Sequence, residues 1–401
     1  MSVYIVGAKR TAIGSFLGSL KDVTAPELGS LVIKAALAEA KVAEAAVDEV
    51  ILGNVLSSGQ KQGVARQAAI KAGLPVEVPA YAINMVCGSG MKAVMNGFTQ
   101  IASGMTNVVV AGGVESMSQA PFLVSSKIRQ GQKMGDLTMT DTILHDALLD
   151  SFDGKHMGIT AENIAEKYKI SREDQDQFAY HSQEKAIAAV DNGSFKAEIV
   201  PVEVKTRQGI HTVETDEYPN RRTDETKLAK LRPAFKPDGT VSAGNSSGLN
   251  DGASATVLVS ESYLKENQLT PLVEVIAIGQ GGVAPELMGL GPTPAIKSAL
   301  KQGGLTLADM DVIELNEAFA AQSLGVLREL SEAYNVTEES LKEKTNLNGG
   351  AIALGHPLGA SGNRIIVSLI HLMKKNKLKY GLASLCIGGG MGVAVILKNI
   401  P

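Results

Sequence analysis

An internal repeat of one α/β unit constrains the fold of this chain more than any other feature of its sequence. The run DEVIL at residues 48–52 reappears as DVIEL at residues 311–315, and a Ser-Gly pair at 89–90 reappears at 361–362. In both halves an apolar helical stretch follows the Ser-Gly pair, and a strand leading to a glycine turn comes next. Such a repeat indicates duplication of a whole supersecondary unit. We therefore predict two similar domains that pack face to face.

The first third of the sequence alternates short apolar runs with helical patterns. The expected strands are residues 3–6, 49–52, 82–84 and 108–110, and the expected helices are residues 25–40, 65–72 and 91–101. This alternation is typical of a parallel or mixed sheet covered by helices, so we predict an α/β fold. A chain of 401 residues also exceeds the size at which a single core usually stops growing, so more than one packed unit is expected.

The middle of the chain, residues 118–245, has a different character. It is polar and rich in lysine, and its strand alternation is weak, so we interpret it as a loop domain between the two halves. A helix is clearly marked within it. Ser171 and Asp174 form a capping box, an amphipathic run follows, and Asn192-Gly193 supplies the stop.

The charge and the cysteine content exclude several classes of function. The 38 basic and 42 acidic residues are interspersed and give a net charge of −4, so the basic surface that nucleic acid or an anionic membrane needs is not expected. The two cysteines, Cys87 and Cys386, are too far apart to suggest a metal finger or a disulfide framework, and we expect no metal site. Without a signal-peptide pattern or an apolar run that could span a membrane, the expected location is cytoplasmic.

Cys87 is the first candidate for a nucleophile. It lies in the sequence NMVCGSGM at residues 84–91, between the end of an expected strand and the start of an expected helix. Backbone N–H groups and the helix dipole at such a position favour a thiolate and an anionic intermediate. The alternative is a small, buried and inert thiol, which is the more common role of an isolated cysteine.

Three further candidates lie in the C-terminal half. His356 belongs to the sequence NGGAIALGHPLGASG at residues 348–362, where glycines let the backbone approach a ligand and a histidine can deprotonate a cysteine near neutral pH. Cys386 precedes three glycines at 388–390, whose N–H groups can point at an oxyanion, although a tight turn beside a buried thiol is the alternative. Asn316 begins the sequence NEAF after an expected strand, where it could hold a water or an acyl oxygen.

Together these segments resemble the thiolase family, because the motifs around Cys87, Asn316, His356 and Cys386 occur in the order of that family and span nearly the whole chain. The resemblance implies a five-layered αβαβα fold, in which two duplicated core domains carry an inserted loop domain. The implied boundaries are residues 1–117 for the N-terminal core domain, 118–245 for the loop domain that binds coenzyme A, 246–273 for the return segment of the N-terminal core domain and 274–401 for the C-terminal core domain.

The resemblance also implies a reaction. His356 would take the proton of Cys87, and the thiolate would attack acetyl-CoA, giving an acetylated Cys87 and free coenzyme A. Cys386 would then remove a C2 proton from a second acetyl-CoA, while His356 and a water bound to Asn316 hold the enolate oxygen. Attack of this carbanion would yield acetoacetyl-CoA, with the tetrahedral oxyanion held by the N–H groups of Cys87 and Gly388. Coenzyme A is a substrate and product here, so no cofactor is expected.

Matching positions of the family place coenzyme A mainly against the loop domain. The implied contacts are Leu148, His156, Met157, Arg221 or Arg222, Phe235, Ala243, Ser247, Met288, Ala318 and Phe319. Arg221 and Arg222 could meet phosphate charge, although adjacent arginines are more often a solvated face. Pattern alone would assign Met157, Met288 and Phe319 to the core, whereas the resemblance puts them along the pantetheine and acyl tunnel.

The leading hypothesis is an acetyl-CoA C-acetyltransferase acting on short chains, because His156, Met157 and Met288 resemble the short-chain biosynthetic branch. A degradative 3-ketoacyl-CoA thiolase would use the same reactive residues with a roomier acyl pocket. A non-catalytic acyl-CoA or lipid-binding relative is a third possibility, against which both cysteines and His356 argue. The resemblance further implies acetyl-CoA, acetoacetyl-CoA and CoA as partners, no nucleic acid or membrane, and a homotetramer built from dimers.

Overall fold

The two halves of the chain build the same strand pattern, as the internal repeat predicts. The computed structural model describes residues 2–400. The first half has the strand order β1 (Val3–Thr11), β11 (Asn250–Ser260), β5 (Val108–Ser116), β3 (Glu49–Gly53) and β4 (Ala80–Ile83). The second half has the order β12 (Val273–Gly282), β15 (Met391–Asn399), β14 (Tyr380–Ile387) and β13 (Val312–Leu315). In each half the first two pairings are antiparallel and the next is parallel. The short antiparallel pair β1·β12 joins both sets into one sheet.

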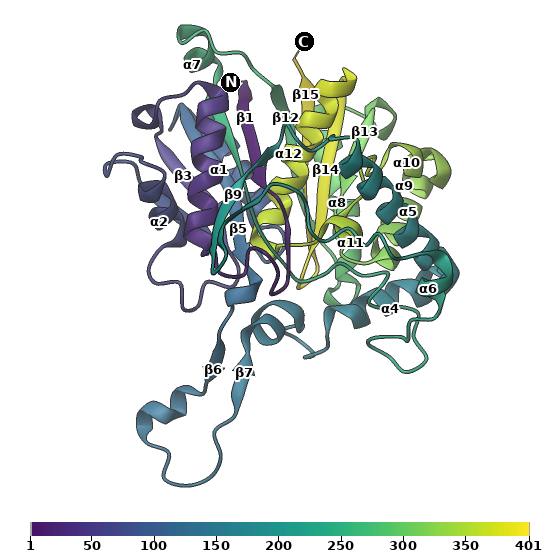
Figure 1. Ribbon diagram of the computed structural model, residues 1–401. Coiled ribbons are helices and arrows are strands. Elements are labelled where there is room, and N and C mark those ends of the chain that lie inside the picture. The colour runs from purple at the N-terminus through teal and green to yellow at the C-terminus, as the bar shows by residue number, and fades with distance from the viewer. Residues whose placement is uncertain (1, 401) are drawn as a thin grey trace.

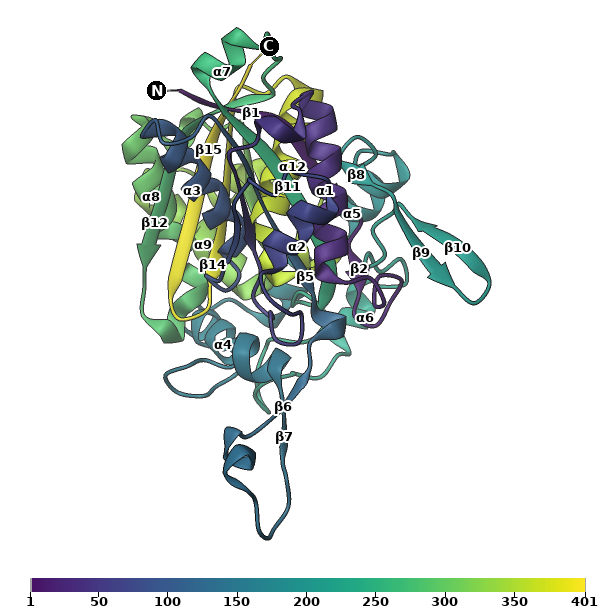
Figure 2. The ribbon, with the colours of Figure 1, turned by 90° about the vertical axis from the view of Figure 1, so that its left-hand side faces the viewer.

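Helices separate the inner faces of the two halves and cover their outer faces (Figure 1, Figure 2). The central layer consists of α3 and α12, whose buried side chains share one core with strands of both halves. α1 and α2 cover the outer face of the first half, and α8 and α9 cover that of the second half. The result is the five-layered αβαβα arrangement, with the halves facing each other across the central helices. The bounds are α1 (Ala25–Ala40), α2 (Val64–Lys71), α3 (Ser89–Ala102), α8 (Pro292–Gly303), α9 (Ala320–Tyr334) and α12 (Leu358–Asn376).

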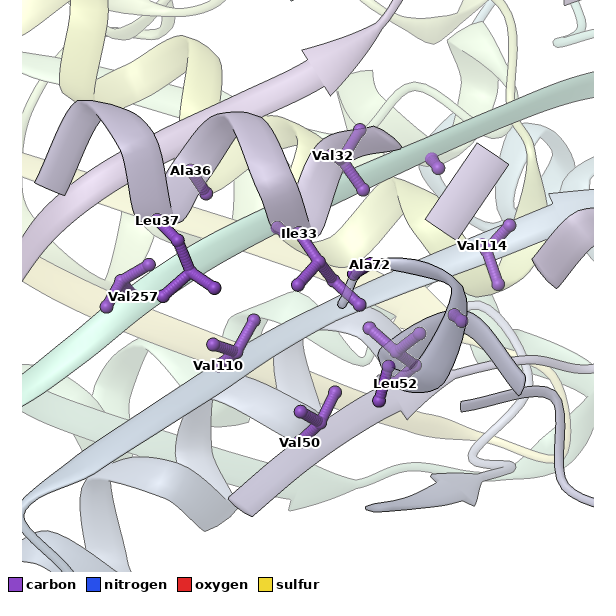
Figure 3. Close-up of a cluster of buried hydrophobic side chains, with 14 of the residues drawn as sticks. Val32, Ile33, Ala36, Leu37, Val50, Leu52, Ala72, Val110, Val114 and Val257 are labelled. Carbon is purple, nitrogen blue, oxygen red and sulfur yellow. The ribbon is translucent and has the colours of Figure 1, made fainter. Parts of the chain in front are cut away.

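Helix α1 shows how local sequence fixes an outer layer. It begins after Thr24, whose backbone N–H donates to the Glu27 carboxylate at 3.0 Å, and it ends at Lys41 in the left-handed region at φ 55°. Its apolar side chains face the sheet, and burying each aliphatic side chain of this size stabilises the fold by about 1.5–3 kcal/mol. Figure 3 shows this contact, which includes Val32, Ile33, Ala36 and Leu37 of α1 and Val50, Leu52, Val110 and Val257 of the sheet.

A long insertion connects β5 to β11, and its first part, with β6, β7 and α4, lies at the bottom of Figure 1. Its elements are β6 (Phe122–Val124), β7 (Met139–Asp141), a π-helical turn (Leu144–Leu148), α4 (Met157–Tyr168), α5 (Arg172–Asp191), β8 (Ile199–Val200), β9 (Val202–Thr206), β10 (Gly209–Val213) and α6 (Glu225–Ala229). The β6–β7 hairpin projects away from the core in both views (Figure 1, Figure 2). The chain leaves β5 at Ser116 and enters β11 at Asn250, so the predicted boundaries at 117 and 245 lie close to this insertion and remain a proposal.

Among the helices of residues 2–400, each is too short or too polar to cross a lipid bilayer.

Candidate active site

The predicted reactive residues gather at one edge of the sheet. Cys87 follows β4, Asn316 follows β13, Cys386 lies near the end of β14, and Gly388 follows that strand. These strands run parallel within their halves, and the carboxyl ends of parallel strands form the usual binding crevice of an open α/β sheet. The duplicated topology therefore brings residues that are about 300 positions apart in sequence to the same edge.

A tight turn presents Cys87 at the start of α3. The Asn84 side chain accepts the Val86 N–H at 2.9 Å, and the Ser89 hydroxyl both accepts the Met85 N–H at 2.8 Å and donates to the Val86 carbonyl at 2.6 Å. Val86 has φ 45°, a left-handed conformation that is strained for a β-branched residue. The hydrogen bonds on both sides of Val86 hold this strained turn, so the position of the Cys87 sulfur is fixed by local structure.

Glycines let the His356 loop approach the first half of the molecule. A side chain at Gly53, Gly90 or Gly113 would overlap the Gly359 carbonyl oxygen. Backbone of the second half therefore lies directly against β3, β5 and the first turn of α3. This contact is what brings the imidazole of His356 into the same cavity as the Cys87 thiol.

The hydrogen bonds of His356 define which ring nitrogen faces the cavity. Its backbone N–H donates to the Asn250 side-chain oxygen at 2.8 Å, and its Nδ1 lies 2.6 Å from the Ser361 hydroxyl. The Ser361 hydroxyl donates to the Pro357 carbonyl at 2.9 Å, so its oxygen is free to accept a proton from Nδ1–H. Nε2 is buried and has no hydrogen-bond partner among the described residues. In this tautomer Nε2 carries the lone pair and can act as a base.

The imidazole and both thiols are neutral at rest. Burial, together with the charge of Arg364, lowers the pKa of His356 to about 3. Burial raises the pKa of Cys87 to about 11, although the Gly388 N–H opposes this shift. The pKa of Cys386 is raised as well, mainly by burial and then by the charge that Cys87 would carry. Backbone amides do lower the pKa of Cys87, as predicted, but desolvation of the sulfur outweighs them.

Asn316 lies beside this group with an unsatisfied side chain. Its backbone N–H donates to the Ser384 carbonyl at 3.0 Å, which fixes it against β14. The side-chain amide is buried, and neither of its polar atoms has a hydrogen-bond partner within residues 2–400. Such an amide costs free energy unless a water or ligand pairs with it. Asn316 is therefore suited to hold a polar group, although it does not itself line the cavity.

The cavity has a volume of about 310 Å³ and is mostly apolar. The predicted site residues that line it are Cys87, Leu148, His156, Met157, Phe235, Ser247, Met288, Ala318, Phe319, His356, Cys386 and Gly388. Ser246, which the family resemblance singled out as able to alter coenzyme A contacts, also lines the cavity. The lining residues that the sequence did not suggest as contacts are Met117, Leu144, Ala147, Gly248, Leu249 and Leu358. This mostly apolar acyl tunnel contains a few reactive groups, which suits an acyl-carrying ligand better than a compact charged one.

Aromatic rings form one wall of the tunnel. His156 stacks on Phe235 with ring centroids 4.5 Å apart, and Phe235 meets Phe319 edge-on at 6.1 Å. His156 caps α4 by accepting the Gly158 N–H at 3.0 Å, and burial lowers its pKa, so the ring is neutral. A Cβ at Gly158 would overlap the Phe235 ring. His156 and Phe235 of the insertion, together with Phe319, therefore give this side of the cavity an uncharged aromatic surface.

Three predicted coenzyme A contacts lie outside this cavity. Arg221 is exposed and forms an ion pair with Asp191, and Arg222 is exposed beside it. Ala243 lines a separate cavity of about 490 Å³ together with Tyr218. Contacts of coenzyme A with Arg221, Arg222 and Ala243 remain a prediction.

Sequence reasoning missed the residues that orient the reactive groups. Ser361 and Asn250 hold His356, and Glu115 accepts the Gly359 N–H at 2.8 Å. Glu115 had one available signal, because it is an acidic residue at the end of a strand that is otherwise apolar. Within residues 2–400, no group of three or more His, Cys, Asp or Glu side chains is arranged to hold a metal ion.

Comparison with known proteins agrees with this arrangement. Residues 3–262 match the family description "Thiolase, N-terminal domain", and residues 269–399 match "Thiolase, C-terminal domain". The chain is 51% identical over 396 residues to an acetyl-CoA acetyltransferase of Escherichia coli strain K12, covering 99% of this chain and 98% of the relative. A crystal structure of the Bacillus anthracis acetyl-CoA acetyltransferase superposes with a TM-score of 0.95 at 43% identity, covering 100% of this chain and 99% of that one. A crystal structure of human mitochondrial 3-ketoacyl-CoA thiolase in complex with CoA superposes with a TM-score of 0.93 at 45% identity. This match covers 100% of this chain and 98% of that one.

Proposed function

This chain belongs to the thiolase family, and from that membership we propose that it is an acetyl-CoA C-acetyltransferase, which condenses two acetyl-CoA molecules to acetoacetyl-CoA and CoA and also catalyses the reverse thiolysis. The observation that carries this proposal is the meeting of two thiols and one imidazole in a single apolar cavity. Relatives named acetyl-CoA acetyltransferase, at about 50% identity over the full chain, support the same activity.

In the first half-reaction Cys87 becomes acetylated. The lone pair of His356 Nε2 accepts the Cys87 proton as the sulfur attacks the thioester carbonyl carbon. The N–H groups of Cys87 and Gly388 hold the resulting oxyanion, and its collapse breaks the bond to the coenzyme A sulfur. Cys386 donates its proton to that sulfur, so CoA leaves as a thiol. The enzyme is then left with acetyl-Cys87, a Cys386 thiolate and a protonated His356.

In the second half-reaction the carbon–carbon bond forms. The Cys386 thiolate removes a C2 proton from the second acetyl-CoA, while protonated His356 and a water on Asn316 hold the enolate oxygen. The carbanion attacks the acetyl carbon on Cys87, and the Cys87 sulfur leaves and takes back the proton from His356. Every residue returns to its neutral resting form, which is the form that burial favours.

Short acyl chains fit this cavity best. Its volume of about 310 Å³ must hold the pantetheine arm as well as the acyl group, and the side chains of Met157 and Met288 line it. The alternative is a degradative 3-ketoacyl-CoA thiolase of broader chain length, which the likeness to the human mitochondrial enzyme keeps open. Thiolysis of acetoacetyl-CoA and of a long-chain 3-ketoacyl-CoA should differ strongly in kcat/KM, in favour of the short substrate. Equal or higher efficiency on the long chain would establish the alternative.

Intact-mass measurement after incubation with acetyl-CoA tests catalysis directly. The wild-type protein should gain the mass of one acetyl group, and Cys87→Ser should gain none. Cys386→Ala should still become acetylated, because protonated His356 can supply the proton that the leaving CoA sulfur no longer receives from Cys386, but it should fail to condense without its base. A non-catalytic acyl-CoA or lipid-binding relative would show no covalent adduct. Loss of acetylation in Cys386→Ala would refute the assignment of Cys87 as nucleophile and Cys386 as base.

Two surfaces support self-association as a homotetramer built from dimers. Strand β4 pairs only with β3 in the described chain, so its outer edge offers unpaired backbone groups to a second copy. The β6–β7 hairpin exposes apolar side chains, with Phe122 61% and Met139 65% exposed. Size-exclusion chromatography coupled to light scattering should give a mass four times that of one chain. A monomeric mass would contradict this part of the proposal.

A cytoplasmic location fits the chemistry, because Cys87 and Cys386 are both free and must remain thiols to react. Fractionation of cells that express the protein should place its activity with the cytoplasmic enzymes, and recovery in an oxidising compartment would contradict this.

A further inference from the structure

Glu115 is a buried carboxylate that joins the two halves of the active site. It lies next to the last residue of β5 and has no exposed surface. One carboxylate oxygen accepts the Asn54 side-chain N–H and the Leu56 N–H, each at 3.1 Å. The other accepts the Val55 N–H at 3.1 Å and the Gly359 N–H at 2.8 Å. Three donors thus come from the segment after β3, and the fourth comes from the loop that carries His356.

Both of these segments border the reacting groups. Val55 and Leu56 belong to the small apolar cluster against which Cys87 packs, and Leu358 of the same cluster lines the cavity. Gly359 follows Leu358 and is three residues after His356. Glu115 is therefore a direct link between the wall behind the Cys87 thiol and the loop that places the imidazole.

The four hydrogen bonds to Glu115 are best accepted by a carboxylate, because both of its oxygens face N–H donors. All four partners are donors, and a carboxylate offers enough lone pairs to accept them all, whereas a carboxamide would turn an NH₂ group toward two N–H donors. Burial raises the pKa of Glu115 to about 7, and its hydrogen bonds from Leu56, Gly359 and Val55 oppose this rise. Without these N–H donors burial would raise the pKa of Glu115 still further, so they favour the carboxylate form at this buried site.

Activation of the nucleophile does not explain this charge. A negative charge at Glu115 raises the pKa of Cys87, after burial and against the help of the Gly388 N–H, so it disfavours the thiolate. Glu115 also does not line the cavity and cannot touch an acyl group there. The remaining role of Glu115 is to position the reacting groups. Such positioning matters because a misplacement of about 1 Å can lower a reaction rate on the order of 10²-fold.

We propose that Glu115 is a positioning residue for acyl transfer, which locks the Asn54–Leu56 segment to the His356 loop and so sets the distance between the Cys87 sulfur and His356 Nε2. This inference rests on the proposed thiolase function. It assigns to Glu115 an effect on the rate of Cys87 acetylation and none on the binding of coenzyme A, because Glu115 contacts none of the aromatic residues of the tunnel wall.

Glu115→Gln is the decisive variant, because it keeps the shape and removes the charge. We expect the rate of acetyl-Cys87 formation in a single turnover to fall on the order of 10²-fold, while KM for acetyl-CoA stays within about twofold. Glu115→Asp keeps the charge with a shorter reach and should recover part of the rate. Asn54→Ala removes one of the four donors and should lower the acetylation rate less, by about three- to tenfold. If Glu115→Gln does not fold, Asn54→Ala and Glu115→Asp together test the proposal.

Glu162→Gln is a matched control. Glu162 is also a buried carboxylate, and it accepts the Thr240 and Val241 N–H groups at 2.9 Å within the insertion between β5 and β11; none of these three residues lines the cavity. It should lower the melting temperature and keep the acetylation rate within about twofold. The proposal is overturned if the folded Glu115 variants acetylate as fast as wild type, or if their rate loss is matched by Glu162→Gln or accompanied by an equal rise in KM. Absence of acetylation in the wild-type protein would instead refute the proposed function itself.

Discussion

Replacement of Ser361 by alanine tests how the imidazole is prepared for catalysis. The Ser361 hydroxyl is the only partner of His356 Nδ1 in residues 2–400, at 2.6 Å, and it is itself anchored to the Pro357 carbonyl at 2.9 Å. Because this hydroxyl accepts from Nδ1–H, it selects the tautomer whose Nε2 lone pair faces the cavity. Ser361→Ala leaves Nδ1–H buried and unpaired, and it frees the ring to turn or to adopt the other tautomer.

The magnitude follows from the cost of an unpaired buried donor, which is about 1–3 kcal/mol. At about 1.4 kcal/mol for each factor of ten, kcat should fall by about 5- to 150-fold. KM for acetoacetyl-CoA should change by less than about threefold, because the tunnel wall of His156 and Phe235 does not involve Ser361. Thiolysis of acetoacetyl-CoA by CoA, followed with substrate concentration, separates the two parameters.

Ser254→Ala is the matched control for this experiment. Ser254 is also fully buried, and its hydroxyl donates to the Ala360 carbonyl at 3.0 Å in the first turn of α12, but it does not contact His356. It should lose stability and keep kcat within about twofold. If Ser361→Ala keeps the wild-type kcat, or loses no more than Ser254→Ala, then Ser361 does not orient the imidazole.

Three further results are expected. The alkylation rate of Cys87 by iodoacetamide should rise about tenfold per pH unit between pH 7 and 9, because its pKa is raised to about 11 and the thiolate fraction grows below that value; a plateau below pH 8 would contradict this. Gly113→Ala should lower the melting temperature and nearly abolish kcat, since its Cβ would overlap the Gly359 carbonyl oxygen, and a stable, active variant would show that the loop can retreat. Phe235→Ala should raise KM for CoA about three- to tenfold in steady-state thiolysis, because it removes the ring stacked on His156 at 4.5 Å; an unchanged KM would exclude the aromatic wall from binding.

Much of the fold could be predicted because its signals are local. The capped helix at residues 25–40 is α1 with the same bounds, and the capping box at Ser171 begins α5 as expected. The helix after Cys87 begins at Ser89, two residues earlier than residue 91, because the hydroxyl of Ser89 closes the turn that presents the nucleophile. The β1·β12 pair that joins the two halves has no local signal, because it depends on contact between residues about 270 positions apart.

The reactive side chains were easier to predict than the residues that hold them. Cys87, His356 and Cys386 could be predicted because each lies in a glycine-rich motif and these motifs occur in the order of the thiolase family. Glu115 and Gly359 are 244 residues apart, and no periodicity or motif links them. The charge state of Cys87 was also beyond the sequence, since it depends on how completely apolar side chains remove water from the sulfur.

The neutral resting site also explains the order of the two half-reactions. Burial disfavours every charged form of Cys87, His356 and Cys386, so charge develops only when a substrate is present to share it with fixed N–H groups. A charge on Cys87 would raise the pKa of Cys386 further, and acetylation of Cys87 removes that possibility. Cys386 can therefore carry a negative charge more easily after Cys87 has become a neutral thioester. In the proposed mechanism this coupling favours acetylation of Cys87 first and proton removal by Cys386 second.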